Sequence, residues 1–169
     1  MANKNQPDSI QGQLQQLGRT AGVLANKLTG EFYKVGGWRL FNAGNNKVML
    51  ITTVGRKSGR RFTTPIGYIR DKEYFYVLTR RDNGQISNWF RNAQANGKVW
   101  LQIEDKRYVG QAEAFADYEQ VLPTMQLWAR LNPTYFRFLG VNLNGRRTLS
   151  EAEVAIAAKK VVTARIKFV

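Results

Sequence analysis

The segment Val48–Tyr68, VMLITTVGRKSGRRFTTPIGY, constrains the fold of this chain more than any other part of it. It opens with the apolar and β-branched run Val48–Val54, whose composition favours a strand. A second strand-like run, Phe62–Ile69, comes after a short stretch of glycines and cations. Two strands joined by a short loop that glycines bound predict a β-hairpin.

The loop of this hairpin has the composition of an anion site. Gly55 and Gly59 can adopt positive φ, so backbone N–H groups can converge on one point. Around them stand one hydroxyl and four cations, namely Ser58, Arg56, Lys57, Arg60 and Arg61. Such a set suits a phosphate or a carboxylate. The alternative is a solvated basic turn that only keeps the hairpin soluble, because charged surface loops are common.

Two missing residue types exclude several classes of chemistry. The 169 residues suffice for one domain with a core, and they include no cysteine and no histidine. Disulfides, thiol catalysis, zinc–thiolate sites and an imidazole base are therefore excluded. The 12 acidic residues are scattered and form no calcium loop, so we expect no metal site. An enzyme of this composition would need an organic cofactor for its chemistry.

The net charge predicts anionic partners. Lys and Arg outnumber Asp and Glu by 26 to 12, which gives a formal charge of +14. No run reaches the 18 or so apolar residues of a membrane span, and the polar N-terminus lacks a signal-peptide core. We expect a cytoplasmic protein, with peripheral contact to the inner, anionic face of the membrane as an open alternative. The oligomeric state stays open.

Hydrophobic periodicity and turn signals divide the chain in two. Residues 1–43 are expected to be helical or irregular, with a weak helix over Ile10–Leu28 and an aromatic segment over Glu31–Ala43. Residues 44–169 are expected to form the cofactor-binding domain. Beyond the hairpin this domain should contain four strands, at Tyr74–Thr79, Val99–Glu104, Arg107–Phe115 and Val161–Val169. Three helices are expected. The first is Ile86–Ala95, with Ser87 or Asn83 as its cap, and the second is Asp117–Ala129, with Asp117 as its cap. The third is Ala152–Lys160, which a capping box at Thr148–Glu151 precedes.

This order of elements predicts a mainly β, α+β architecture: about six strands in an antiparallel meander, with helices at the rim of a small closed or half-closed barrel. The loops after the first and third strands should meet at one end of the barrel. The second of these loops is also basic, with Arg80 and Arg81 before Gly84. A helix carrying Trp89 would stand beside both, so the sequence predicts one shared anion site.

The stretches LITTVGRKSGRRFTTPIGY and SNWFRNAQANGKVWLQIEDKRYVGQAEAF resemble the deazaflavin-dependent nitroreductase family of flavin/deazaflavin oxidoreductases. The resemblance covers about Lys47–Phe115, with order and spacing preserved. It implies a split β-barrel that binds coenzyme F-420, a deazaflavin with a phosphate and an acidic oligoglutamate tail. Related barrels prefer FMN, so FMN stays as the alternative cofactor.

The resemblance also assigns residues to the cofactor. The phosphate and tail would be held by Arg56, Lys57, Ser58 and Arg61, and the ring approached by Thr63, Thr64 and Pro65. Beside the ring would lie Thr79, Arg80, Arg81, Asn83 and Gly84, with Asn92 and Asn96 as polar contacts or caps and Trp89 as packing. The chain departs from the family pattern at its second basic loop, at Phe90 in place of Tyr and at Gly97 in place of Pro.

The activity that the resemblance implies is transfer of a hydride from the reduced cofactor to a flat acceptor such as a quinone or nitroaromatic. Water, a lysine or Tyr135 could protonate the product. Six aromatic residues could form the substrate wall or simply be core, namely Trp38, Phe41, Trp128, Tyr135, Phe136 and Phe138.

Two other classes of function stay open at this stage. One is a barrel that binds FMN, haem or a fatty acid with little turnover. The other is a basic nucleic-acid module, which the lack of an RNA-recognition aromatic motif disfavours.

Overall fold

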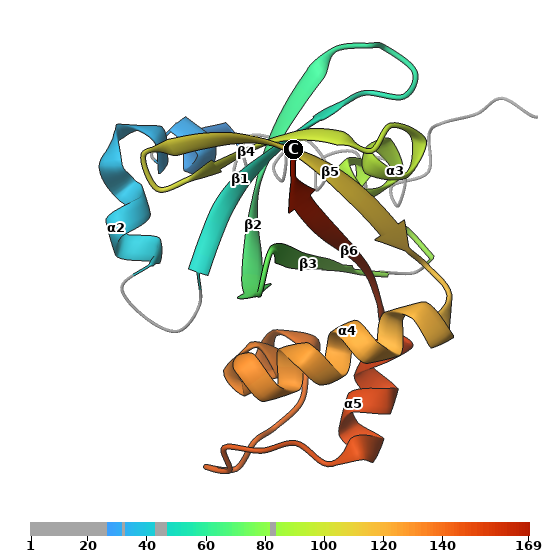
Figure 1. The fold of residues 1–169 in the computed structure, drawn as a ribbon. Coiled ribbons are helices and arrows are strands. Elements are labelled where there is room, and N and C mark those ends of the chain that lie inside the picture. The colour runs from blue at the N-terminus through green and yellow to red at the C-terminus, as the bar shows by residue number, and fades with distance from the viewer. Residues whose placement is uncertain (1–26, 32, 43–46, 82–83) are drawn as a thin grey trace, which may run out of the picture.

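The computed structural model describes residues 27–31, 33–42, 47–81 and 84–169. Six antiparallel strands close into a barrel in the order β1-β2-β3-β6-β5-β4 (Figure 1). The predicted α+β barrel of about six antiparallel strands is therefore confirmed. The strands are β1 (Lys47–Val54), β2 (Arg61–Asp71), β3 (Tyr74–Arg80), β4 (Lys98–Ile103), β5 (Lys106–Phe115) and β6 (Val161–Phe168).

The predicted hairpin is formed by β1 and β2, which pair from Lys47 opposite Tyr68 to Val54 opposite Arg61. β2 is long and changes neighbours along its length, because it pairs with β3 only over residues 68–71. Within the described chain, the first seven residues of β2 therefore pair with β1 alone. The end of the hairpin projects beyond the rest of the barrel (Figure 1), and this projection shapes the candidate site.

The helices occupy different sides of the barrel (Figure 1). α3 (Asn88–Ala95) stands near the projecting hairpin, and its buried Trp89, Phe90 and Ala93 face the barrel as the helical spacing predicts. α4 (Tyr118–Leu131), the 3₁₀ helix η2 (Pro133–Leu139) and α5 (Glu151–Ala158) gather at the far side. They cover the outer surface of β3 and β6.

Two separate cores result from this arrangement. The first fills the barrel with alternate strand residues such as Met49, Val77 and Ile166. The second lies outside the barrel, where Trp128 and Phe136 pack with residues of α5, β3 and β6. Because the sheet buries both its faces in this region, the first four residues of β6 are all buried, although apolar and polar residues alternate from Val162 to Phe168.

The N-terminal segment is anchored by one phenol. Residues 27–31 are helical, and the π-helix η1 (Tyr33–Gly37) and the short helix α2 (Trp38–Phe41) come next, with Gly36 at φ 100°. The buried Tyr33 hydroxyl donates to the carbonyl of Val48 and accepts from the N–H of Glu104, both at 2.9 Å. Most of the weak helix predicted over residues 10–28, and the boundary predicted after residue 43, lie outside the described residues.

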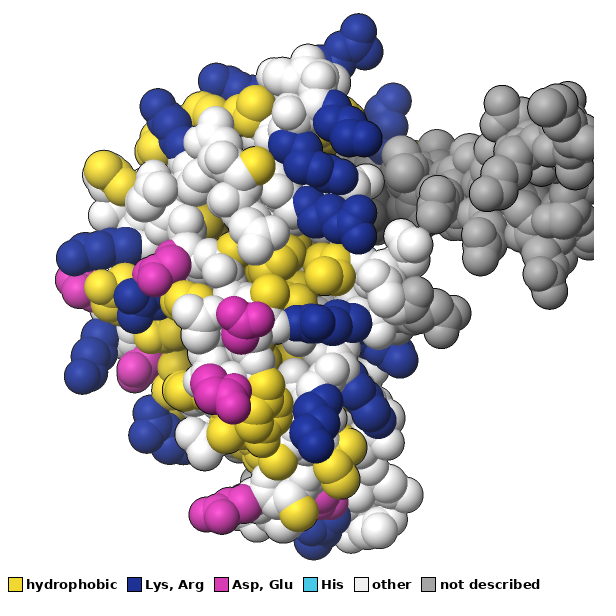
Figure 2. Space-filling view, turned by 90° about the vertical axis from the view of Figure 1, so that its right-hand side faces the viewer, with side chains coloured by type: hydrophobic (Ala, Val, Ile, Leu, Met, Phe, Trp, Pro, Cys, Tyr) yellow, Lys and Arg dark blue, Asp and Glu magenta, His cyan; other side chains and the backbone are white. Residues whose placement is uncertain are grey.

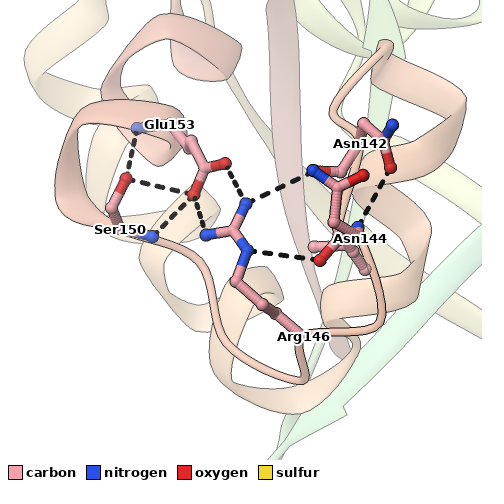
Figure 3. Close-up of polar contacts among 6 residues, drawn as sticks. Asn142, Asn144, Arg146, Ser150 and Glu153 are labelled. Carbon is pink, nitrogen blue, oxygen red and sulfur yellow. Dashed lines mark hydrogen bonds and ion pairs between the residues drawn. The ribbon is translucent and has the colours of Figure 1, made fainter.

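Helix capping differs from the sequence prediction in three places. The box before α5 is formed by Ser150 and Glu153, two residues later than predicted (Figure 3). Asp117 and Ser87 do occupy the positions before α4 and α3, but neither side chain bonds to its helix. Ser87 fails to cap because its hydroxyl is bonded to that of Thr79 at 2.7 Å.

Candidate functional site

The basic loop between β1 and β2 is a closed turn that exposes its cations. The N–H of Gly55 donates to the carbonyl of Arg60, and the N–H of Gly59 donates to the carbonyl of Gly55, both at 2.8 Å. Gly59 adopts φ +66°, and a Cβ on Gly55 would lie 2.6 Å from the ring of Phe62. Both glycines are thus required by geometry, as the sequence predicts. Residues 56–60 are all exposed.

One buried amide holds this loop against α3. The Oδ1 of Asn92 accepts from the backbone N–H and from the guanidinium of Arg56, at 3.2 and 3.3 Å. Its Nδ2 donates to the hydroxyl of Thr53 at 3.3 Å. Asn92 is only 3% exposed, so these bonds replace the water that its amide loses. The predicted polar residue of α3 is therefore a tether between helix, strand and loop.

A groove of about 520 Å³ lies beside the tether. One wall is the first part of β2, with Arg61, Phe62, Thr63 and Thr64, which β3 leaves unpaired. The opposite wall comes from the start of α3, namely Ser87, Asn88, Trp89 and Asn92, and the N-terminal segment closes the groove with Lys27, Gly30, Glu31 and Lys34.

The groove combines a flat apolar surface with positive charge. Phe62, which is 50% exposed, offers a ring, Trp89 adds the 5% of its surface that is exposed, and Lys27, Lys34 and Arg61 offer cations. Figure 2 shows Lys and Arg side chains over the upper part of one face, where no acidic side chain of the described residues is visible. The single acidic residue on the groove lining, Glu31, is paired with Lys34 at 2.9 Å.

Arg61 stands where this groove meets a second hollow. Its guanidinium carbon lies 4.1 Å from the centre of the Trp100 ring, within cation–π distance. The second hollow, of about 310 Å³, runs over the outer face of β1, β4 and β5 and shares Lys34, Arg61 and Thr63 with the groove. A long anionic ligand could therefore pass from one hollow to the other across Arg61.

Further along the same face of β2 stands Tyr135. Strand residues two apart share a face, so Thr63, Pro65 and Gly67 lie in one row. A Cβ on Gly67 would approach the Tyr135 ring to 2.9 Å, so the glycine lets the phenol sit directly on the strand. Burial raises the pKa of Tyr135, which keeps its hydroxyl protonated at neutral pH. Pro65 is half-buried opposite Leu50 and is not part of the groove lining.

The second basic loop does not join the groove, contrary to the prediction of one shared mouth. β3 pairs with β6 along its whole length, which places Arg80 opposite Val161. The Arg81 guanidinium donates to the carbonyls of Val161 and Ala116, on the side of the barrel where α4 begins. The hydroxyl of Thr79 is hydrogen-bonded to that of Ser87. Gly84 is an exposed turn residue at φ +74°. Asn83 lies outside the described residues.

The predicted aromatic wall is also divided. Trp128 and Phe136 are fully buried in the second core, so they pack the helices and line no groove. Phe138 is 61% exposed, and its ring centre lies 5.4 Å from that of Tyr135. Trp38 is half-buried under Arg39, while the side chain of Phe41 lies outside the described set.

Asn96 contributes to the turn before β4 and not to the groove. It ends α3 at the far end from the groove, and its Oδ1 accepts from the N–H of Lys98 at 3.1 Å. This is one of the two roles predicted for it, that of a cap.

Several groove residues were missed by sequence reasoning, among them Lys27, Lys34, Phe62, Ser87 and Asn88. The seven-residue spacing of the two lysines, two helical turns, was the one available signal that they share a side. The other three looked like ordinary strand or helix-start residues.

The groove fits a planar ring with an anionic extension. Trp89 and the strand edge of β2 can receive a ring, the hydroxyls of Thr63 and Thr64 can bond to its polar edge, and the loop cations lie next to Arg61. A phosphate or carboxylate on the same ligand would meet those cations. Fold and site together thus define a barrel that binds an anionic ring-containing ligand.

The comparison with protein families identifies the family to which this barrel protein belongs. The sequence model of the "F420H(2)-dependent quinone reductase" family matches residues 25–139, which is more than half of the chain. The chain belongs to this family. It is therefore an F-420-dependent reductase, an oxidoreductase whose cofactor is coenzyme F-420. No curated protein matches the sequence.

One solved structure in particular supports the fold. It is described as a domain-swapped dimer and aligns with a TM-score of 0.50 at 17% identity, covering 85% of this chain and 97% of that one. Two others align with lower scores. An F420-H2 dependent reductase (FDR-A) aligns at 0.47 and 18% identity, covering 71% and 93%. An F420 reductase aligns at 0.47 and 16% identity, covering 79% and 94%.

Proposed function

We propose that this protein transfers a hydride from reduced coenzyme F-420 to a flat acceptor such as a quinone or a nitroaromatic compound. The observation that carries the proposal is the groove between the unpaired edge of β2 and α3, which opens beside the tethered basic loop. It joins a flat apolar surface to positive charge in a chain that lacks histidine and cysteine. FMN is the secondary candidate for the same groove.

The roles of the residues derive from their positions. Arg56, Lys57, Ser58 and Arg61 would bind the phosphate and the start of the acidic tail, with Asn92 fixing the loop that carries them. Thr63, Thr64 and Trp89 would orient the ring and exclude water from one side of it.

The chemistry divides between cofactor and protein. When bound, the reduced deazaflavin supplies two electrons and one hydrogen as a hydride, and a quinone then needs one proton to become a hydroquinone. Tyr135, which stays protonated on the same strand face, is the protein group proposed to donate that proton. Phe138 beside it would offer an exposed ring to the acceptor.

The double variant Lys57→Ala/Arg61→Ala tests the cofactor site. Each charge-assisted bond is worth about 1.5–3 kcal/mol, so we expect the affinity for coenzyme F-420, measured by fluorescence titration, to fall at least about tenfold. Turnover of a water-soluble quinone should fall with it at limiting cofactor.

A matched control removes two positive charges elsewhere. Arg130→Ala/Arg137→Ala takes them from the exposed ends of α4 and η2, far along the chain from the basic loop. Its affinity for the cofactor should stay near that of the unchanged protein. An equal loss in both double variants would mean that only the overall charge matters, and the assignment of Lys57 and Arg61 would be wrong.

We further propose that the N-terminal segment touches an anionic membrane, where quinones are dissolved. Leu28, Val35 and Leu40 are 62, 82 and 74% exposed, and they alternate with Lys27, Lys34 and Arg39. Exposed apolar and basic side chains together favour binding to anionic lipid surfaces. In the described part of the chain, no helix is long and apolar enough to span a bilayer.

Flotation with liposomes tests this contact. The protein should float with vesicles that contain anionic lipid, and Val35→Ser/Leu40→Ser should reduce the floating fraction severalfold. If the floating fraction depended neither on the lipid charge nor on these two side chains, the membrane contact would be refuted. The proposal for the cofactor site would not be affected.

A further inference from the structure

Another pocket lies away from the cofactor groove, shares only Tyr108 with the second hollow, and has no part in the proposed reaction. It encloses about 370 Å³ between the barrel end, where β1 begins, and the end of α4. Its lining shares no residue with the groove. Along β2 it begins at Tyr68, four residues past Thr64, the last β2 residue of the groove lining, which corresponds to about 13 Å of extended strand.

Aromatic rings form the wall of this pocket. Tyr68 contacts Phe75 at 5.5 Å between ring centres, and Phe75 contacts Phe168 at 4.7 Å. Phe168 in turn stacks on Tyr108 at 4.5 Å with an interplanar angle of 12°. The first two pairs are tilted by 49° and 43°, so the wall offers both ring faces and ring edges. Such a wall favours an aromatic body as ligand over a flexible aliphatic chain, because rings gain from offset and edge contacts with other rings.

Tyr68 presents an unused polar group to the pocket. The residue is 7% exposed, and its hydroxyl makes no hydrogen bond to any described residue. Burial, before all other causes, raises the pKa of Tyr68 to about 12. The hydroxyl therefore stays a donor at every physiological pH, and it can give a hydrogen bond to a ligand oxygen without losing a protein partner.

Two cations complete the pocket. Lys47 and Arg70 are exposed and line it. Neither forms an ion pair with a carboxylate of the described residues. Arg70 lies 5.3 Å from the centre of the Phe75 ring, so its charge stands directly over the aromatic wall. Glu104, the nearest acidic influence on Tyr68, is exposed and lies outside the lining.

From these observations we infer that the pocket binds a small aromatic carboxylate, with its ring against Phe75 and Phe168 and its carboxylate between Tyr68, Lys47 and Arg70. The inference is independent of the proposed reductase activity. A pocket of this volume belongs to the range of small-molecule sites. The donor set, one neutral hydroxyl and two cations, is that of a carboxylate.

Calorimetric titration of the full chain with 2-naphthoate tests the inference. Binding should be saturable, should be at least several-fold weaker for the uncharged amide of the same ring, and should be unchanged by saturating coenzyme F-420. Octanoate carries the same carboxylate on an aliphatic body and should bind more weakly than naphthoate. Preferred binding of octanoate would refute the aromatic class, and absence of naphthoate binding at millimolar concentration would refute the site.

Tyr68→Phe is the decisive variant, because it removes one oxygen and keeps the ring. Naphthoate affinity should fall about tenfold, the effect of one hydrogen bond to a charged group. The thermal midpoint should not fall, because the lost hydroxyl has no partner in the described protein. Tyr74→Phe on β3, outside the pocket, is the matched control and should keep full affinity. Equal affinity in both variants would overturn the role of Tyr68.

Discussion

Single residues of this protein show how a charged contact can be strong and still lie at the surface. Glu153 accepts from the guanidinium of Arg146 at 2.7 Å and from the backbone N–H of Ser150 at 2.9 Å (Figure 3). Arg146 also donates to the carbonyls of Leu143 and Asn142, so it ties the connection after η2 to the start of α5. The Arg146 guanidinium, followed by the Ser150 backbone, lowers the pKa of Glu153 to about 2.

This depressed pKa predicts an acid-dependent loss of stability. In the unfolded chain the pKa of Glu153 is near its ordinary value of 4.5, so its contribution to the stability of the folded protein is complete above that pH. The contribution is lost as the pH falls from about 4.5 towards 2, because the carboxyl then takes up a proton. Glu153→Gln should thus lower the urea midpoint at pH 7, and the difference from the unchanged protein should shrink towards pH 2.

Glu151→Gln provides the comparison for this measurement. Glu151 stands in the same first turn of α5 but forms no ion pair with any described residue. The urea midpoint of the Glu151→Gln variant should stay close to that of the unchanged protein across the pH range. If the two variants gave the same pH profile, the Arg146 contact would not be the source of the effect.

At the scale of elements, the site depends on how α3 is joined to the hairpin. Strand pairing holds the projecting loop only through β1 and β2, because β3 does not pair with the first seven residues of β2. Asn92 supplies the missing connection, since one side chain bonds to Arg56 in the loop and to Thr53 in β1. The position of the loop cations is therefore set by a helix more than thirty residues away in sequence.

Asn92→Ala should disturb both stability and binding. The change leaves the Arg56 N–H and the Thr53 hydroxyl without their partner, and we expect a loss of roughly 2 kcal/mol in unfolding free energy. Cofactor affinity should fall several-fold as the loop loosens. Urea unfolding and fluorescence titration measure the two effects.

Asn96→Ala, at the end of the same helix, separates the tether from a general effect of losing an asparagine. Asn96 is exposed and bonds only to the N–H of Lys98 through its side chain within the described chain. Its removal should cost less than about 1 kcal/mol and leave cofactor affinity unchanged. Similar results for both variants would argue against the tether.

At the scale of the whole molecule, the groove, the second core and the pocket of Tyr68 lie in different parts of the barrel. The unpaired edge of β2, α3 and the N-terminal segment enclose the groove, whereas α4, η2 and α5 bury the second core on the far side. The third region, between the start of β1 and the end of α4, holds the pocket of Tyr68. Figure 2 shows Lys and Arg side chains over the whole height of one face, whereas acidic side chains of the described residues are visible only in its middle and lower parts.

Local patterns in the sequence were enough to predict the strands, the hairpin and the apolar face of α3. These features depend on neighbours along the chain, such as the β-branched run in Val48–Val54 or the helical spacing of Trp89 and Phe90. The glycines and cations of the basic loop belong to this group too. So does the family, because each of its two motifs is a continuous stretch of the chain.

Only the tertiary structure decided which residues meet across the barrel. The sequence could not show that β3 pairs with β6 and carries Arg81 away from the groove, nor that Trp128 and Phe136 are core. It could not show the Asn92 tether, the lysines of the N-terminal segment or the pocket of Tyr68 either. The reason is physical: strand and helix formation depends on short-range periodicity, whereas a site is made by long-range pairing and packing, which single-residue patterns do not encode.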